Sequence, residues 1–229
     1  MPNNTTLIFI GGVTLEEMIP QVERYFGHMS RAPEPERYAG REYVWEVQPN
    51  VFVERHISDL EPGTAIDLAA GEGRNSVWLA RQGWSVTAVD FSEAGLQKAA
   101  KLAADSGVAD RVVTVAGDAT AWTPAEPVDL VVIAYLQLPP EQVRTVLEHA
   151  AAWLRPGGRV FVVAHDRSNI EHGYGGPPIP DRCYDLDETV AALAPLEIER
   201  AEVAERHVET DDGAKTALDT LVIARRPTA

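Results

Sequence analysis

Residues 65–75 read Ala-Ile-Asp-Leu-Ala-Ala-Gly-Glu-Gly-Arg-Asn and decide the fold. They predict a short apolar strand ending in an acid, then a turn with two glycines, then a helix over 74–82 that stops at Gly83. A second apolar strand over 86–89 ends in Asp90. An acid at the end of the second strand, about 20 positions beyond a glycine loop, has the spacing of a ribose-hydroxyl acceptor. The stretch therefore predicts a β-α-β unit that binds a nucleotide-type ligand.

The acids around this loop indicate which ligand it binds. Glycines let the backbone approach a ligand closely, and a dinucleotide would place its pyrophosphate on the helix N-terminus. Here Asp67 precedes the loop, Glu72 lies inside it, and Ser76 takes the place of a third glycine. Because two carboxylates repel a pyrophosphate and attract a cation, the loop fits the sulfonium and amino group of S-adenosylmethionine (SAM) better than NAD.

The composition excludes several classes of protein. The chain has 229 residues, of which 45% are hydrophobic, enough for one sizeable α/β domain with a small extension. A net charge of −15 without a run of Lys or Arg argues against a nucleic-acid substrate. The single cysteine, Cys183, excludes an internal disulfide and a cysteine metal cluster. The early apolar run 7–10 is too short for a signal peptide or a membrane span, so we expect a cytoplasmic protein with no membrane partner.

Strands and helices alternate through the rest of the chain. The predicted elements are a helix over 93–106 capped by Ser92, strands over 111–116 and 129–134, a helix over 141–154 opened by Pro139-Pro140, a turn at 156–158, a strand over 159–164, a long loop over 165–183 and a short helix from Asp187. Two last strands, 196–205 and 217–225, flank Asp211-Asp212-Gly213, which is a hairpin signal. This order predicts an α/β fold with a mostly parallel sheet and one antiparallel strand.

The N-terminal part stands outside this pattern. A short strand over 5–10 and a helix after Thr14 precede a linker rich in Pro, Glu and Arg over 31–41. Residues 43–59 predict a helical lead-in with a start signal at Pro49-Asn50. We therefore expect an N-terminal extension and linker over 1–42 and one domain over 43–229.

Several segments occur in the order and spacing of a known family. They read DLAAGEGRN, VTAVDFS, GDATAW, VDLVVIAYL and LRPGG, followed by the hairpin. From about residue 43 to 226 the chain resembles the class I SAM-dependent methyltransferases. Within that family, WLARQGWSVTAVDFS and HDRSN are similar to small-molecule methyltransferases of the tellurite-resistance and thiopurine type. The resemblance implies a Rossmann-like, mostly parallel seven-stranded sheet with one antiparallel strand in a C-terminal hairpin, and SAM as the cofactor.

The resemblance also assigns the cofactor contacts. The acid of the first strand lies near the methionyl amino group, the acid of the second near the ribose, and the aromatic residue after it against adenine. The implied cofactor-binding residues are Asp67, Ala69, Gly71, Gly73, Asn75, Asp90, Phe91, Asp118, Ala119 and Ala134. Plainer alternatives stay open: Asp67 or Asp90 as a helix cap, Asp118 as a turn former, and Phe91 as core.

Candidate catalytic groups follow the fourth and fifth strands, whose carboxyl ends meet the ligand in open α/β sheets. They are Tyr135, His165 and Arg167. His165 is the first choice as a base or hydrogen-bond donor, or it caps the strand. Arg167 binds an anionic acceptor or forms a salt bridge. No metal-ligand spacing is recognisable, and the glycine-rich stretch 173–176 has the composition of a lid or of an ordinary loop.

These residues predict transfer of a methyl group from SAM to a small-molecule acceptor, such as a thiol or chalcogen, by in-line displacement. The region 134–140 reads AYLQLPP and lacks the Asn/Asp-Pro-Pro-aromatic motif usual in nucleic-acid amino-group methyltransferases. Two alternatives stay open: a nicotinamide-dependent oxidoreductase, and a non-catalytic SAM-binding or partner-binding protein. A homodimer is open as well.

Overall fold

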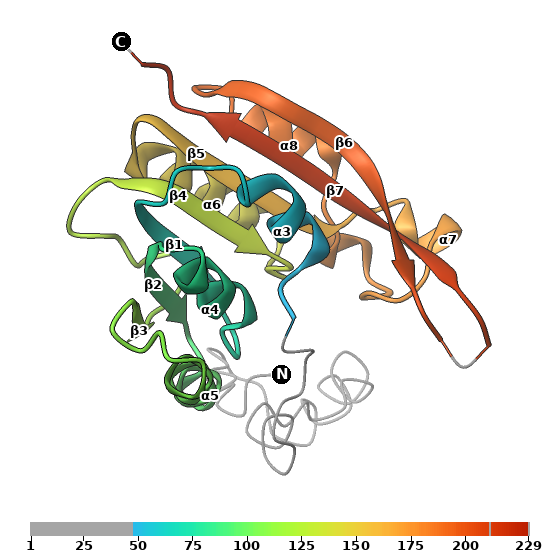
Figure 1. Ribbon diagram of the computed structural model, residues 1–229. Helices are drawn as coiled ribbons and strands as arrows, with labels where there is room; N and C mark the ends of the chain where they lie inside the picture. The colour runs from blue at the N-terminus through green and yellow to red at the C-terminus, as the bar shows by residue number, and fades with distance from the viewer. Residues whose placement is uncertain (1–47, 211, 229) are drawn as a thin grey trace, which may run out of the picture. The chain divides into compact units, whose positions relative to one another are not determined.

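The computed structural model describes residues 48–210 and 212–228 (Figure 1). Within them, seven strands form one sheet in the order β3-β2-β1-β4-β5-β7-β6. The strands are β1 (Thr64–Leu68), β2 (Ser85–Asp90), β3 (Val112–Ala116), β4 (Val128–Ala134), β5 (Leu154–His165), β6 (Glu197–Val208) and β7 (Lys215–Arg225). In this sheet β7 runs antiparallel to both of its neighbours, β5 and β6, and the other four strand pairs are parallel. The predicted α/β fold, with one antiparallel strand in a C-terminal hairpin, is confirmed.

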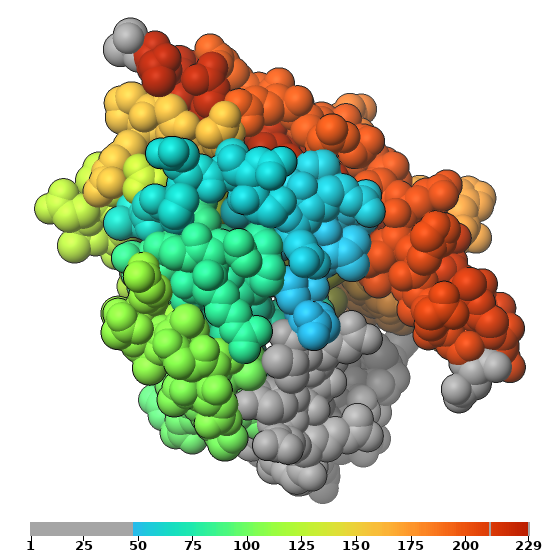
Figure 2. All heavy atoms as spheres, viewed as in Figure 1, coloured from blue at the N-terminus to red at the C-terminus, as the bar shows by residue number. Residues whose placement is uncertain are grey.

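Helices cover both faces of the sheet (Figure 1). On one face lie α3 (Val51–Ile57), α4 (Arg74–Arg81) and α5 (Glu93–Asp105); on the other lie α6 (Pro140–Trp153) and α8 (Leu186–Ala192). The central strand β4 is apolar on both faces, and its residues 130–133 are fully buried, as a strand between two helical layers requires. In Figure 2, α3 lies between α4 and the β6–β7 hairpin.

Local signals explain where the helices begin. The Asn50 side chain accepts hydrogen bonds from the N–H groups of Phe52 and Val53 and so caps α3. Ser92 caps α5 in the same way, through the N–H of Gly95. The predicted start signal at Asn50 is therefore confirmed, and the part of the predicted lead-in over 43–47 lies outside the described residues. The elements predicted within residues 1–47, and the domain boundary predicted at 42/43, lie outside the described residues.

Two predicted connections differ from the structure. The turn expected at 156–158 lies inside β5, where the pairing with β4 jumps from Val128↔Leu154 to Leu130↔Arg159. The pairing is irregular here, and Gly157 within this irregularity has a φ of 83°, which a glycine adopts without strain. The predicted loop over 165–183 contains α7 (Asn169–His172) and a 3₁₀ turn, η1 (Pro180–Arg182).

The glycine loop after β1 packs tightly against α5. Gly73 has a φ of 80°, and a Cβ atom there would lie 2.5 Å from the Ala99 Cβ. Gly107 has a similar φ of 71° but has open space where its Cβ would stand. Alanine substitutions at Gly73 and Gly107 can therefore separate the cost of backbone strain from the cost of a steric clash.

We predict that Gly107→Ala lowers the free energy of unfolding by about 1–2 kcal/mol, the cost of an L-residue in the left-handed region. Gly73→Ala should lower it by about 1–3 kcal/mol more, because its methyl group also overpacks the contact with Ala99. Urea unfolding of both variants measures the difference. Equal losses would show that the loop does not press on α5.

Candidate cofactor and acceptor site

Asp90 joins the loops that follow the first three strands. Its Oδ2 accepts a hydrogen bond from the Gly71 N–H at 2.8 Å, and its Oδ1 accepts one from the Ser92 N–H at 2.8 Å. Its backbone carbonyl accepts the N–H of Gly117, which follows β3, at 3.0 Å. Each carboxylate oxygen has a further lone pair for a ligand hydroxyl. The acid predicted to bind ribose therefore also holds the glycine loop in place.

Burial acts against the charge on this acid. Asp90 is 7% exposed, and burial raises its pKa above the usual value, while the N–H donors of Ser92 and Gly71 oppose that rise. A hydroxyl donor from a ribose would add to the same stabilisation of the carboxylate.

The loop backbone is shaped for close approach. Gly71 and Gly73 have φ values of 56° and 80°, and Ala69, which is not a glycine, has a φ of 63°. Non-glycine residues rarely adopt a positive φ, and the few that do are often found at functional sites. From the side of α5, Gly95 approaches so closely that a Cβ there would lie 3.0 Å from the Gly71 carbonyl oxygen. Ala69, Gly71 and Gly73 thus form one turn with positive φ values, and of these three residues only Ala69 has a strained backbone.

Asp67 is the acid best placed for a cation. It is 1% exposed, and its Oδ2 accepts a 2.6 Å hydrogen bond from the Ser76 hydroxyl. Burial raises the pKa of Asp67 to about 6. Glu72 differs from the expectation, because it forms a 2.8 Å ion pair with Lys98 of α5 and is 4% exposed. Its charge is balanced within the protein, so the electrostatic argument for a cationic ligand rests on Asp67.

The predicted adenine contacts lie at the ends of β2 and β3. Phe91 is 65% exposed, so it is not a core residue and offers a ring face beside Asp90. Asp118 is also exposed, and its Oδ1 accepts hydrogen bonds from the N–H and hydroxyl of Thr120 at 2.8 and 2.7 Å. These hydrogen bonds lower the pKa of Asp118. Ala119 is half-buried against the core. Asp118 therefore forms a local turn, and its role toward adenine stays a prediction.

Asn75 and Ala134 complete the predicted cofactor set. The Asn75 Oδ1 accepts the backbone N–H of Asn50 at 2.9 Å, which ties the start of α3 to the first turn of α4. Ala134 ends β4 and pairs with Val163 of β5. Both residues lie beside the acceptor-side groups described next.

The structure brings together two of the three candidate catalytic groups. The rings of Tyr135 and His165 have centroids 4.9 Å apart. Arg167 instead forms ion pairs with Asp185 and Glu188 at the N-terminus of α8, at 3.4 and 3.1 Å. Gly176, in the glycine-rich stretch, lies so close to His165 that a Cβ there would stand 2.8 Å from the ring. Whether that stretch acts as a lid stays a prediction.

Sequence reasoning missed the residues that support this pair. The Tyr135 hydroxyl donates to the Asp219 Oδ2 at 2.7 Å and accepts from the Asn50 Nδ2 at 3.3 Å. Arg206 donates its Nε–H to the same Asp219 oxygen at 2.7 Å. The signal for Asp219 was available, since it is the one acid in the apolar strand sequence ALDTLVI over 217–223.

Two absences concern only the part of the chain that the structure describes. Within 48–210 and 212–228, no three His, Cys, Asp or Glu side chains are grouped so as to hold a metal ion. In the same ranges, every helix is too short or too polar to span a bilayer.

Comparisons with known proteins agree with this geometry. Residues 65–158 match the family described as "Methyltransferase domain". A demethylmenaquinone methyltransferase from Clavibacter sepedonicus is 32% identical over 160 residues, which cover 68% of this chain and 58% of the relative. Ribosomal RNA small subunit methyltransferase C from Alcanivorax borkumensis is 33% identical over 111 residues, or 46% of this chain and 33% of the relative. The chain spans between 33% and 58% of the length of the curated relatives it matches.

Solved structures share the fold at low sequence identity. TehB from Haemophilus influenzae has a TM-score of 0.66 at 18% identity, covering 78% of this chain and 62% of that one. The N-methyltransferase NodS from Bradyrhizobium japonicum, in complex with S-adenosyl-L-homocysteine, has a TM-score of 0.62 at 17% identity, covering 84% and 96%. These structures show the shared fold, and the matched domain and the curated methyltransferases support the family predicted from the sequence. Residues 65–158 are a methyltransferase domain, and the findings support a class I SAM-dependent methyltransferase with SAM as its cofactor.

Proposed function

We propose that the protein transfers a methyl group from SAM to a small-molecule acceptor. The observation that carries the proposal is the placement of Tyr135 and His165, with their rings 4.9 Å apart, at the ends of β4 and β5. β4 lies next to β1, and β1 lies next to β2; Asp67 near the end of β1 and Asp90 at the end of β2 are the cofactor residues in this proposal. In an open α/β sheet both ligands meet at this edge, so the two rings are suited to receive the acceptor.

In this proposal different residues of the chain bind different parts of SAM. Asp90 would accept the ribose hydroxyls, Asp67 the methionyl amino group, and the exposed ring of Phe91 would stack on adenine. When bound, SAM supplies a methyl group on a sulfonium, which an aligned acceptor takes by in-line displacement. Alignment alone accounts for up to about 7–11 kcal/mol of barrier reduction in well-oriented reactions, so the acceptor side mainly has to orient and exclude water.

Tyr135 and His165 have different roles in this proposal. The Tyr135 hydroxyl already donates to Asp219, and burial, with the Asp219 charge second, raises the pKa of Tyr135 above its usual value. Tyr135 therefore stays neutral and contributes its ring and its position. His165 remains as the group that accepts a proton where an oxygen or nitrogen acceptor requires a base. A thiol or chalcogen anion needs no such base.

The relatives are all named as methyltransferases, but their names point to different acceptors. Their matches cover only part of their length, so a quinone-type or RNA acceptor does not transfer to this chain. The net charge of −15 argues against an RNA acceptor. The match to a methyltransferase domain and SAM as the supported cofactor argue against the nicotinamide alternative. A non-catalytic SAM-binding protein is the remaining competitor, and turnover separates it from an enzyme.

We predict that the wild-type protein forms S-adenosylhomocysteine from SAM when supplied with a panel of small thiols, selenite and tellurite. His165→Gln should lower kcat most for acceptors that must lose a proton, by about 10²–10⁴-fold, the range of general-base contributions. Arg144→Gln, at an exposed position on α6, is the matched control. SAM binding without product from any acceptor would identify a binding protein instead.

A second prediction concerns the buried charge of Asp67. Its pKa rises from 3.8 in the unfolded chain to about 6 in the fold, so the folded state binds more protons between these values and loses stability as pH rises through them. Asp67→Asn should therefore melt above wild type at about pH 8, and the gap should close toward about pH 4. The same variant should bind SAM about 10- to 100-fold more weakly, since hydrogen bonds to charged groups contribute roughly 1.5–3 kcal/mol.

Calorimetry across pH checks the direction of both changes, in melting temperature and in SAM affinity. Wild-type SAM affinity should fall below about pH 6 as Asp67 takes up a proton, and Asp67→Asn should lack this dependence. Asp110→Asn, at an exposed acid, is the control and should change neither quantity. A variant that binds SAM as tightly as wild type would remove Asp67 from the cofactor site.

A further inference from the structure

Asp219 is a buried carboxylate where three strands meet. It is 0% exposed and pairs in register with His165 of β5 on one side and Ala204 of β6 on the other. Its Oδ2 accepts the Tyr135 hydroxyl and the Arg206 Nε–H, both at 2.7 Å. Its Oδ1 lies 3.2 Å from the His165 Nδ1, although the two atoms are not aligned as a hydrogen bond. One side chain thus contacts both acceptor-side rings and a cation.

The charge on Asp219 is stabilised in spite of its burial. Burial alone would raise its pKa, but the surrounding donors and the Arg206 charge outweigh this and hold the pKa below its usual value. The carboxylate is therefore ionised at neutral pH and acts as a fixed hydrogen-bond acceptor. The Arg206 guanidinium carbon also lies 5.6 Å above the Tyr135 ring, so it contacts that residue from a second direction.

Tyr135 needs such support because its backbone is strained. It has a φ of 57°, a genuine outlier for a bulky residue. Such conformations cost about 1–3 kcal/mol and persist only where surrounding contacts determine them. Here the hydroxyl is held from two sides, by Asp219 and by Asn50.

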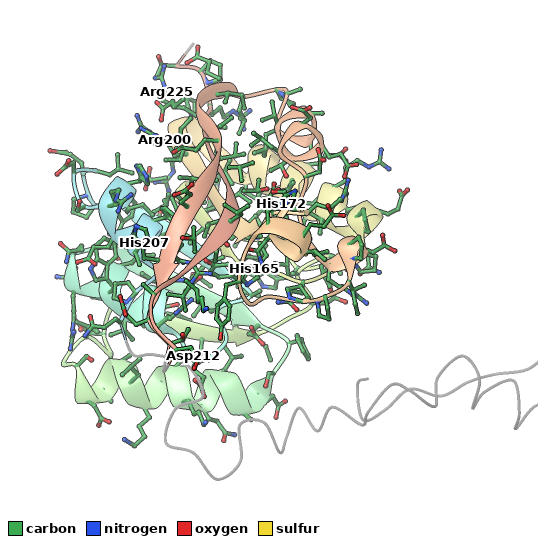
Figure 3. All side chains as sticks on the ribbon, turned by 90° about the vertical axis from the view of Figure 1, so that its right-hand side faces the viewer. His165, His172, Arg200, His207, Asp212 and Arg225 are labelled. Carbon is green, nitrogen blue, oxygen red and sulfur yellow. The ribbon has the colours of Figure 1, made fainter. Side chains whose placement is uncertain are left out.

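The same hydrogen bonds extend to α4, the helix that follows the glycine loop and is called the cofactor helix below. Asn50 donates its side-chain N–H to the Tyr135 hydroxyl and its backbone N–H to the Asn75 side chain in the first turn of α4. A continuous series of hydrogen bonds therefore joins α4, the start of α3, the end of β4 and the β6–β7 hairpin. Figure 3 shows His165 beside the middle of that hairpin, with Arg200 and Arg225 toward one end and Asp212 at the tip.

We propose that Asp219 is a positioning residue for methyl transfer: it holds the Tyr135 ring and the Arg206 guanidinium at the acceptor side and fixes their distance from the cofactor helix. This inference rests on the proposed function. Asp219 is not a catalytic residue, because its side chain is fully buried and cannot touch a substrate. It acts through Tyr135 and Arg206.

The test compares two buried aspartates. Asp219→Asn removes the charge that holds Tyr135 and Arg206. Asp166→Asn is the matched control: Asp166 is 6% exposed and its carboxylate hydrogen-bonds Ser168 and Thr220. Asp166 follows His165 in the chain, as Thr220 follows Asp219, but its carboxylate does not hold the Tyr135 hydroxyl or the Arg206 guanidinium. Both variants should lose stability. Only Asp219→Asn should lower kcat, by about 10²-fold, the loss that follows a 1 Å misplacement, with SAM affinity unchanged by calorimetry.

A readout without an acceptor keeps this inference separate from the proposed function. In crystal structures with S-adenosylhomocysteine, Tyr135 and Arg206 should be displaced in Asp219→Asn and in place in Asp166→Asn. If wild type turns over no acceptor, the proposed function fails, and these structures still decide whether Asp219 positions the two residues. Unmoved side chains, or equal kcat losses in the two variants, would overturn the proposal.

A second variant covers the case in which Asp219→Asn does not fold. Tyr135→Phe retains the ring and removes only the hydroxyl that Asp219 holds. It should also lower kcat while SAM affinity stays at the wild-type value, and its ring should lie away from the wild-type position. A Tyr135→Phe protein with wild-type kcat and an unmoved ring would contradict the positioning role.

Discussion

The hydrogen bond from the Gly71 N–H to the Asp90 carboxylate is the contact on which the rest of the site depends. It joins the loop after β1 to the end of β2, and the Asp90 carbonyl joins the segment after β3 through Gly117. The acid that we propose as the ribose acceptor is therefore also the acid that holds the glycine loop. Loss of this carboxylate would change the loop and the ligand contact together.

Several buried acids lie at the carboxyl edge of the sheet, and each carboxylate has different partners. Asp67 keeps a raised pKa and one hydroxyl donor, which leaves it ready for a cationic ligand. Asp219 has Arg206 and Tyr135 as donors and stays ionised. Glu72 pairs with Lys98. Both donors on the Asp219 Oδ2 are side chains of this protein, and the acid holds these side chains in position.

The repeating apolar strands and the glycine loop were sufficient to predict the sheet, its single antiparallel strand, and the roles offered by Asp67 and Asp90. Those features depend on local patterns and short spacings. The sequence could not show that Glu72 is paired, because Lys98 lies a helix away in the chain. It could not show that Arg167 turns toward α8, or that Asp219 reaches Tyr135 across 84 residues. Such contacts depend on strand register, which the linear pattern does not contain.

The most direct test is the SAM dissociation constant of Asp90→Asn by calorimetry. The amide cannot accept both backbone N–H groups without pointing its own N–H₂ at one of them, so affinity should fall at least about 100-fold, or about 2.7 kcal/mol. Asp129→Asn is the comparison: that carboxylate also takes a backbone N–H, from Thr64, and joins β1 to β4, but at the opposite edge of the sheet. The account predicts lost binding in the first variant and wild-type binding in the second. Wild-type SAM affinity in Asp90→Asn would contradict it.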